Sequence, residues 1–469
     1  MRTRTHQNTL LRQITPYFST FFTDREYFRQ VFHFALPIAL QNLVTASLNM
    51  VGVVMIGQLG EVPVAAVGLA NQIFFLLQLV LFGITSGAAI FTAQLWGKQD
   101  LPNIRKVISL GLLLVGAASL FFFSLAVFRP ELVLGIYSKD PAVVALGSEY
   151  LHIFGAAYLF FGVTMTFGVM LRSTGDVKTP MTISILALAF NTVLSYVLIF
   201  GKLGIPALGV RGAAYAALAS RVLESTIMLM VVYRYRSSLA PRLKDFLGLS
   251  LAFVGRVFKP ILPVILNETF WSLGITAYYA IYARIGTDAL AAMNIVSTIE
   301  NMALVLTFGL AHATAILVGN HIGSGDKERA YQYAGRSLAM TMLIGLFIGS
   351  LVMVLSPYIL ELYKVGPVVI EMAQRVLNIL ALFLWVRACN AVIVVGILRS
   401  GGDTRFSFFL DGVIIWVVGV PMAMLGAFVL DLPVYWVYLM IMSEEVLKWT
   451  LGMRRYFSRK WINDLAQTV

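Results

Sequence analysis

Residues 171–176 read Leu-Arg-Ser-Thr-Gly-Asp, and residues 398–403 read Leu-Arg-Ser-Gly-Gly-Asp. An offset of about 226 residues aligns these two stretches and many other positions. The other matches include Leu36-Pro37 with Leu262-Pro263, Gly60 with Gly286, Phe82-Gly83 with Phe308-Gly309, Gly97 with Gly323, and Asp100 with Asp326. Chance similarity between apolar segments would align Leu, Val and Ile, whereas this offset aligns Pro, Gly, Asp and Arg. The chain therefore contains an internal repeat that divides it into two halves.

The composition excludes most classes of soluble protein. Of the 469 residues, 59% are apolar and 12% are charged, whereas about a quarter of the residues in a soluble domain are charged. This excludes an ordinary cytosolic enzyme, a nucleic-acid-binding domain and a disordered chain. The single cysteine, Cys389, excludes an internal disulfide and a cysteine-based metal site. A membrane-spanning helix needs about 20 apolar residues, so the length fits about a dozen spans.

Apolar stretches follow one another along the chain with short polar connections between them. They lie at 31–56, 64–96, 107–128, 142–171, 181–201 and 212–233, and then at 257–283, 289–319, 337–360, 368–398, 406–430 and 433–453. We therefore predict an all-α polytopic membrane protein with twelve transmembrane helices. Because six helices separate the repeated positions, we expect two six-helix bundles related by a pseudo-twofold axis along the membrane normal. The expected divisions are a first bundle at 1–234, an amphipathic linker at 235–256 and a second bundle at 257–469.

Positive charges are unequally divided between the two sides of the predicted membrane. Most of the 35 Lys and Arg residues fall at the termini and in connections on one side, a set that includes Arg399 and Lys448. Those on the other side are Arg129, Lys139, Lys202, Arg211, Arg284 and Lys364. Since positively charged loops stay inside, we expect a multi-pass protein of the cell (inner) membrane with both termini in the cytoplasm. The basic N-terminal segment and the linker would then lie at the cytoplasmic surface.

Several motifs of the chain point to one transporter family. They are Ala-Leu-Pro-Ile-Ala-Leu at 35–40, Val-Met-Ile-Gly-Gln-Leu-Gly at 54–60, Gly-Lys-Gln-Asp at 97–100, Gly-Ser-Gly-Asp at 323–326, the stretch 194–201, and the paired Arg-Ser-x-Gly-Asp turns. Over nearly its whole length the chain resembles the multidrug and toxic-compound extrusion (MATE) family. The resemblance implies a V-shaped pair of bundles that exports cationic or amphipathic organic compounds, driven by inward flow of H⁺ or Na⁺. We expect no cofactor, no enzyme activity and a monomer in the lipid bilayer.

Ionisable residues inside the apolar stretches are the main functional candidates, because a charge near the membrane centre is costly unless it is paired or neutralised. Glu268 is the clearest, since it lies well inside its stretch and matches by context the coupling glutamate of the family's NorM-type branch. The residues expected to couple cation flow are Glu268, Glu300, Asp411, Asp403 and Arg387. Asp403 is also expected to act as a turn or helix-capping residue. Arg387 is expected to pair with one of the acids.

The first half lacks acids that members of the family carry. Gly52 and Ser195 stand where one branch or another has aspartate, so we expect coupling through the second half. The cargo is expected to contact neutral and aromatic side chains, since aromatic faces suit an amphipathic cation. The expected substrate-binding residues are Asn42, Gln78, Asn191, Tyr278 and Tyr279.

Four other polar residues within the spans are expected to be structural. Arg221 and Glu224 lie three residues apart on one helix and should neutralise each other. His152 and His312 are each surrounded by small apolar residues, which favours packing, and no spacing predicts a metal site.

Two alternative functions are weighed against drug efflux. A related lipid-linked oligosaccharide flippase would need a more cationic central groove, whereas the buried charges here lean acidic. A membrane-embedded enzyme would gather His, Asp or Ser near one interface, and the sequence shows no such cluster.

Overall fold

The structure is a computed structural model that describes residues 24–236 and 238–469, and all regular secondary structure within these ranges is helical. The predicted basic segment before residue 24 lies outside the described residues. The first half contains α2 (Arg25–Gly57), α3 (Glu61–Gly97), α4 (Leu101–Phe128), α5 (Pro130–Gly135), α6 (Pro141–Phe154), α7 (Ala157–Ser173), α8 (Lys178–Phe200), α9 (Gly209–Tyr235) and α10 (Leu243–Leu247). The second half contains α11 (Leu251–Ile285), α12 (Thr287–Gly323), α13 (Lys327–Leu360), α14 (Pro367–Ala391), η1 (Val392–Arg399), α15 (Thr404–Ser407), η2 (Phe408–Val413), η3 (Ile415–Gly419), α16 (Val420–Met424), η4 (Leu425–Val429), α17 (Val434–Phe457) and η5 (Leu465–Gln467).

The long helices account for twelve membrane spans. Among the described residues, nine helices are long and apolar enough to cross a membrane, with α14–η1 and α15–η4 each counted as one. The pair α6–α7, which is bent by 52°, adds a tenth. α11 and α17 are also long enough but more polar, because α11 carries Glu268 and α17 carries Glu444 and Lys448. With these two helices the predicted all-α, twelve-helix fold is confirmed.

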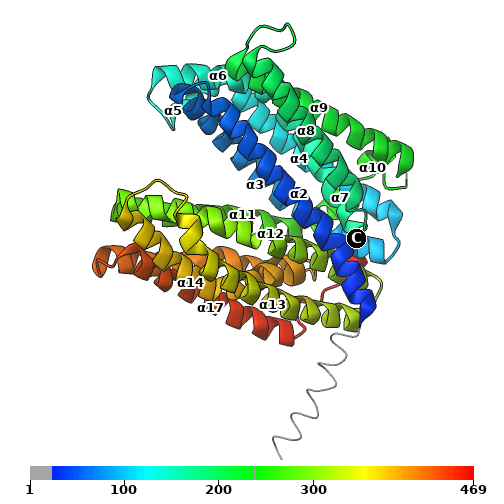
Figure 1. Ribbon diagram of the computed structural model, residues 1–469. Helices are drawn as coiled ribbons and strands as arrows, with labels where there is room; N and C mark the ends of the chain where they lie inside the picture. The colour runs from blue at the N-terminus through cyan, green and yellow to red at the C-terminus, as the bar shows by residue number, and fades with distance from the viewer. Residues whose placement is uncertain (1–23, 237) are drawn as a thin grey trace, which may run out of the picture.

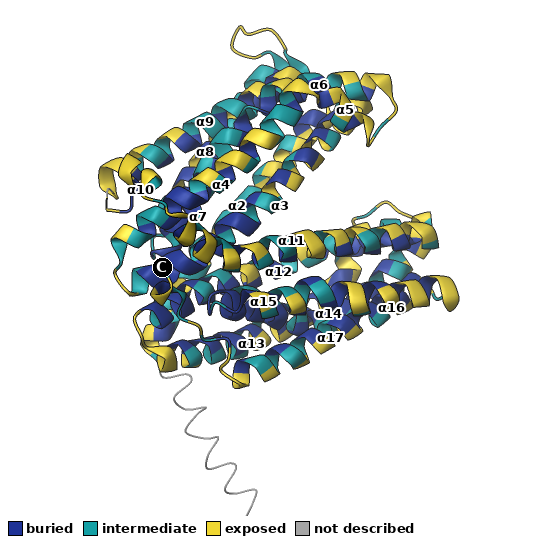
Figure 2. Cartoon of the chain, turned by 180° about the vertical axis from the view of Figure 1, so that it is seen from behind, coloured by how far each residue is buried: buried dark blue, intermediate teal, exposed yellow. Residues whose placement is uncertain are grey.

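The helices form two lobes that diverge like the arms of a V (Figure 1). The first lobe contains α2–α10 and the second contains α11–α17. Both the start of α2 and the C-terminus lie at the narrow end, which we call the terminal face, and we call the wide end the open face (Figure 1). Figure 2 shows buried residues gathered near the C-terminus, where the lobes meet, and many exposed ones along the arms.

Helix pairs that the repeat relates hold the two lobes together. α3 of the first lobe packs on α11, and correspondingly α12 of the second lobe packs on α2. A Cβ at Gly83 of α3 would lie 2.8 Å from the Cα of Ile265. A Cβ at its repeat mate, Gly309 of α12, would lie 2.8 Å from the carbonyl oxygen of Ala35. The matching contacts are those of two lobes related by a pseudo-twofold axis.

A second pair of repeated glycines brings α3 and α12 into backbone contact near the terminal face. A Cβ at Gly97 would collide with the backbone of Asn320, and a Cβ at Gly323 would collide with the backbone of Gln94. The repeat therefore preserves glycines where the lobes approach most closely, and the closure lies on the terminal side.

The segment after α17 adds polar contacts to this closure. Trp461 is fully buried and packs within the second lobe. The side-chain amide of Gln94, on α3 of the first lobe, donates to the carbonyl oxygens of Ser400 (2.9 Å) and Asn463 (3.1 Å). Its oxygen accepts from the backbone N–H of Leu465 at 2.7 Å. One side chain of the first lobe thus holds the tail of the second.

The two Arg-Ser-x-Gly-Asp turns fold alike but use their aspartates differently. Gly175 and Gly402 both have positive φ angles, 90° and 79°, which a glycine adopts without strain. Asp176 accepts a bond from the backbone N–H of Thr179, at the start of α8. Asp403 precedes α15 but makes no capping bond, and it pairs with Arg455 at 2.6 Å instead. The turn expected of Asp403 is present, since its N–H donates to the carbonyl oxygen of Leu398 at 2.8 Å. The alternative, a side-chain cap, is absent because Arg455 takes the carboxylate.

The predicted linker folds against the first lobe. α10 is five residues long, and Asp245 within it lies 3.5 Å from Arg105 of α4. α11 begins at Leu251, before the apolar stretch that predicted it, because Ser250 caps its first turn by accepting from the Phe253 N–H at 3.2 Å.

Candidate transport site

A cavity of about 840 Å³ lies mainly in the first lobe. Its lining comes mostly from α2, α3, α7, α8 and α9. The second lobe contributes residues of α12 and η1 that lie toward the terminal face, among them His312 and Arg399. The cavity therefore reaches the second lobe at its base, where the two lobes close.

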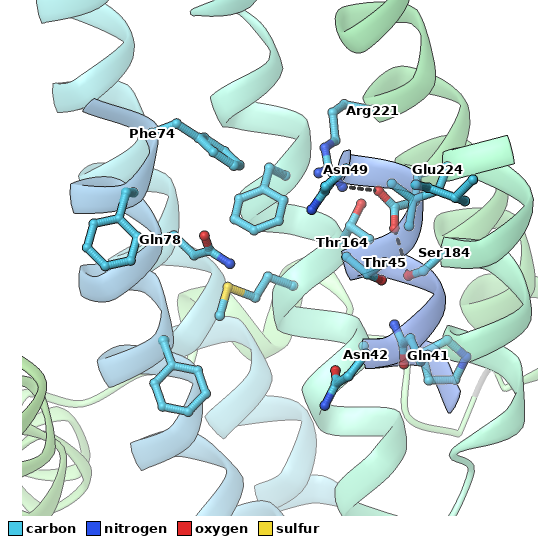
Figure 3. A pocket seen from close by; sticks show the side chains of 18 of the residues that line it. Gln41, Asn42, Thr45, Asn49, Phe74, Gln78, Thr164, Ser184, Arg221 and Glu224 are labelled. Atoms are coloured by element: carbon cyan, nitrogen blue, oxygen red, sulfur yellow. Dashed lines mark hydrogen bonds and ion pairs between the residues drawn. The ribbon is translucent and has the colours of Figure 1, made fainter. Parts of the chain in front are cut away.

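Two facing walls of the cavity differ in chemistry, as Figure 3 shows. The wall formed by α2 is polar and carries Gln41, Asn42, Thr45 and Asn49. The wall formed by α3 is largely aromatic and carries Phe74, Phe75, Gln78 and Phe82. From Asn42 and from Phe75 onward the residues of each set are three or four apart, which puts them on one face of their helix. A cavity with one hydrogen-bonding wall and one aromatic wall suits a compound with a polar and an apolar part.

An ion pair lies beside the polar wall. Arg221 of α9 donates to Glu224 at 2.7 Å, and Ser184 of α8 donates to the same carboxylate at 2.8 Å. The Arg221 guanidinium also lies 4.9 Å from the ring centre of Phe161. The predicted pairing of Arg221 with Glu224 is confirmed. Glu224 is the only acid among the described residues that line the cavity, and both its oxygens are already bonded.

The second lobe contains a buried chain of polar groups that we call the Lys448 network. Lys448 of α17 lies 2.9 Å from Asp411 and 2.5 Å from Glu444. Asp411 also accepts from the side chain of Asn267 at 3.0 Å, and Glu444 accepts from the hydroxyl of Tyr278. Lys448 and Glu444 are each 2% exposed, so a single buried cation faces two carboxyl groups.

A second set of buried charges, the Arg387 network, lies in the same lobe. Arg387 lies 2.5 Å from Glu300 and 3.6 Å from Glu445, and it donates to the Tyr438 hydroxyl at 3.0 Å. Asn390 donates to the Glu445 carboxylate at 2.7 Å. The expected pairing of Arg387 with a predicted acid is confirmed, and the acid is Glu300.

One ion pair connects these buried charges to the cavity. Arg399 of η1 lies 2.6 Å from Glu268 of α11, and its Nε donates to Ser407 at 3.4 Å. Arg399 lines the cavity base, while Glu268 lies behind it. η1 is a π-helical segment, a distortion that is common at functional sites.

The predicted residues thus fall into three places. Asn42, Gln78 and Asn191 line the cavity, as do Gly52 and Ser195. Glu268, Glu300, Asp411 and Arg387 lie in the buried charges of the second lobe, whereas Asp403 lies at the terminal face with Arg455. The two tyrosines do not line the cavity. Tyr278 belongs to the Lys448 network, and the Tyr279 ring packs edge-on against Tyr282.

Several members of this charge arrangement are not among the residues predicted from the sequence. Arg399 and Lys448 were counted in the connections outside the membrane, and this is wrong, because both are at most 3% exposed within the lobe. Glu444 and Glu445 were not considered. The sequence does contain a pattern that indicates them, because Glu444-Glu445-x-x-Lys448 interrupts the apolar stretch 433–453. Charges four residues apart, such as Glu444 and Lys448, share a helix face.

The fold and the site together define a two-lobed, multi-pass membrane transporter. The model of the MatE family matches residues 37–197 and 260–425, and the chain belongs to this family of multidrug efflux transporters. Similar curated proteins include the "Probable multidrug resistance protein NorM" of Thermotoga maritima, 24% identical with 92% of this chain and 93% of that protein covered. Another, with the same name, is from Rhizobium meliloti, 30% identical with 84% and 85% covered.

Solved structures share the fold. A structure described as the outward-facing conformation of a multidrug resistance MATE family transporter superposes with a TM-score of 0.83, at 20% identity, over 92% of this chain and 96% of that one. A MOP superfamily transporter from Pyrococcus furiosus, described as having a binding pocket of reverse polarity, gives a TM-score of 0.82 at 21% identity with the same coverage.

Proposed function

We propose that this protein is a secondary active transporter that exports small amphipathic organic compounds by alternating access, in exchange for inward-moving H⁺. The names of its relatives, multidrug resistance proteins, support export of varied compounds. For a protein of the inner membrane, the positive-inside rule favours a terminal face that points to the cytoplasm. The V would then open to the outside, and the cavity would be ready to release its cargo.

The observation that carries this proposal is the imbalance of charge in the second lobe. The Lys448 network, the Arg387 network and the Glu268–Arg399 pair contain five carboxyl groups, Glu268, Glu300, Asp411, Glu444 and Glu445. They contain three cations, Arg387, Arg399 and Lys448. Uncompensated carboxylates are costly in a membrane interior, so we infer that these groups carry protons that they can exchange.

Glu268 is the group best placed to couple a proton to the cargo. Its partner Arg399 lines the cavity base, so a proton on Glu268 would break a 2.6 Å ion pair and release a guanidinium toward the cavity. Any such change alters the charge that the cargo meets. A ligand and a proton that act on one pair of residues can shift the equilibrium between two facing states.

Na⁺ is the second candidate for the coupling ion, and one observation favours it. The side-chain oxygens of Asn267 and Asn390 are buried and have no hydrogen-bond partner among the described residues. Each amide lies beside a carboxylate, Asp411 and Glu445 respectively. Amide and carboxylate oxygens are ligands for hard cations.

Dye transport in reconstituted vesicles tests the proposal and separates the two ions. We would follow uptake of rhodamine 6G, a cation, and fluorescein, an anion on a related ring system, into vesicles with the terminal face outward. We expect an acid-inside gradient to drive uptake of at least one dye and a sodium-inside gradient to drive none. Glu268→Gln should lower the driven uptake by about tenfold or more, while dye binding in detergent is retained.

The matched control is Glu149→Gln, which removes an exposed carboxylate that pairs with Arg211 outside the networks and should leave uptake unchanged. Uptake driven by sodium would replace H⁺ with the second candidate. Uptake of neither dye under either gradient would overturn the proposed function. Full coupling in Glu268→Gln would remove Glu268 from the mechanism.

A further inference from the structure

Arg172 is a cavity arginine that has no hydrogen-bonding or charged partner in the part of the chain that the structure describes. It lies in the last turn of α7, lines the cavity and is half-buried. A Cβ at Gly168, one turn earlier and itself on the cavity wall, would lie 4.0 Å from Arg172 Nη2. The side chain therefore folds back along α7, away from the terminal face. Among the described residues it makes no hydrogen bond or ion pair.

The internal repeat shows that the first lobe has no acid at the position where the second lobe pairs its arginine. The mate of Arg172 is Arg399, whose guanidinium is held by Glu268 at 2.6 Å. The mate of Glu268 is Asn42, so the first lobe has a neutral amide where the second has the acid. The residues that the structure does not describe, 1–23 and 237, contain no Asp or Glu in their sequence and can supply no carboxylate side chain.

The other charges of the cavity are compensated. Arg221 is bonded to Glu224 and Arg399 to Glu268, so within residues 24–236 and 238–469 Arg172 is the one cavity-lining arginine without an acid. An unpaired charge held within a membrane protein is costly and marks a functional site. Guanidinium is also the group that binds carboxylates and other oxyanions with two parallel hydrogen bonds.

We propose that Arg172 binds the acidic group of the cargo, so that this transporter exports amphipathic organic anions or zwitterions that carry one carboxylate or sulfonate. The inference rests on the proposed function and gives its cargo a charge. The aromatic wall of α3 would hold the apolar part, and the amides of α2 would bond neutral polar groups. One free guanidinium matches one negative charge, which disfavours the pyrophosphate of a lipid-linked oligosaccharide.

A cationic cargo fits the same cavity poorly. It would need a free carboxylate, and Glu224 is committed to Arg221 and Ser184. It would also meet the positive charge of Arg172 at the cavity base.

Binding of the two dyes to the purified full chain in a maltoside detergent tests this assignment. Wild-type protein should bind fluorescein more tightly than rhodamine 6G. Arg172→Gln should weaken fluorescein binding by about tenfold or more. Arg172→Lys should bind fluorescein with an affinity between those of the wild type and Arg172→Gln. Asn42→Glu, which rebuilds the arrangement of the second lobe, should weaken fluorescein binding at least as far and strengthen rhodamine 6G binding.

Two controls separate this effect from general loss of charge or of folding. Arg129→Gln removes an exposed arginine outside the cavity and should bind both dyes as the wild type does. Arg172→Gln should unfold at a temperature no lower than the wild type, because it removes an uncompensated charge.

The results that would overturn the assignment are specific. Equal fluorescein binding by wild type and Arg172→Gln, or tighter binding of rhodamine 6G to the wild type, would end it. Inorganic phosphate that binds as tightly as fluorescein would replace an organic cargo with a small anion. Driven uptake of rhodamine 6G alone would contradict this inference and leave the proposed function intact. Fluorescein binding that depends on Arg172, without driven uptake of either dye, would contradict the proposed function and leave this inference intact.

Discussion

The two lobes have one architecture and opposite interiors. Four positions that the repeat aligns make the difference plain: Asn42 with Glu268, Arg172 with Arg399, Ser184 with Asp411, and Arg221 with Lys448. In the first lobe all four residues line the cavity, whereas in the second they form two ion pairs, of which only Arg399 reaches the cavity. The basic residue is kept in both lobes, while the acid appears in the second only.

One fold thus carries two different arrangements of charge. A buried arginine or lysine with an acid partner gives a site that a small cation or proton can perturb. The same base without the acid gives a site that must take its counter-charge from elsewhere. Single substitutions at matched positions can therefore distinguish the lobes, and the expected effects differ in size.

The largest effect is expected from Lys448→Met. It leaves Asp411 and Glu444 buried without their cation, and breaking such an arrangement costs roughly 3–5 kcal/mol. The measurement is the free energy of unfolding in detergent. The matched change in the first lobe, Arg221→Met, strands one acid beside a cavity and should cost less. An equal or smaller loss for Lys448→Met would contradict the view that the second lobe is the drier one.

A smaller effect is expected from Gly323→Ala at the contact between the lobes. The added methyl group would collide with the backbone of Gln94, and overpacking of this kind costs about 1–3 kcal/mol. We expect the lobes to separate on the terminal face, so that a cysteine placed at Ser400, with Cys389 replaced by Ala, reacts faster with a polar maleimide added from that side. Gly116→Ala is the control, because a Cβ there meets nothing within 4 Å. Unchanged labelling in Gly323→Ala would refute this account of the closure.

The smallest effect is expected from Asp24→Asn, which weakens a tie between the lobes. Asp24 caps α2 by accepting from the Tyr27 N–H at 3.0 Å, and it pairs with Arg336 of α13. Burial raises the pKa of Asp24, but the bond from Tyr27 and the charge of Arg336 outweigh it and leave this pKa below its usual value. The variant should lose about 1 kcal/mol of stability at neutral pH.

The pH dependence of that loss follows from the sign of the shift. Since the pKa is lower in the folded protein than in the unfolded chain, the carboxylate stabilises the fold above about pH 4 and ceases to do so as the pH falls through the folded value. Unfolding measured against pH should therefore show wild type and Asp24→Asn converging in acid. Asp326→Asn, an exposed cap within the second lobe that accepts from the Arg329 N–H, should leave the contact between the lobes unaffected. A constant difference at every pH would contradict the role of the charge.

The repeat and the apolar stretches were enough to predict the twelve spans, and the pairing of Arg221 with Glu224 followed from helical spacing alone. The partner of Arg387 had to be one of a few acids, but the choice of Glu300 depends on how α12 and α14 pack. The prediction that Arg399 and Lys448 lie in connections outside the membrane is wrong. A charge near the end of an apolar stretch is typical of a connection between spans. A π-helical segment carries Arg399 inward, and two acids hold Lys448 there. Such partners belong to other helices, and a sequence pattern within one helix does not reveal them.

The contacts of Gln94 have a consequence for how easily the narrow end could open. This one amide satisfies two carbonyl groups and one N–H of the opposite lobe. In the proposed alternating access the lobes would part here, and water could then replace each of these bonds at little change in free energy. The seam is thus made of bonds that solvent can replace, which allows it to be tight when shut without being trapped in that state.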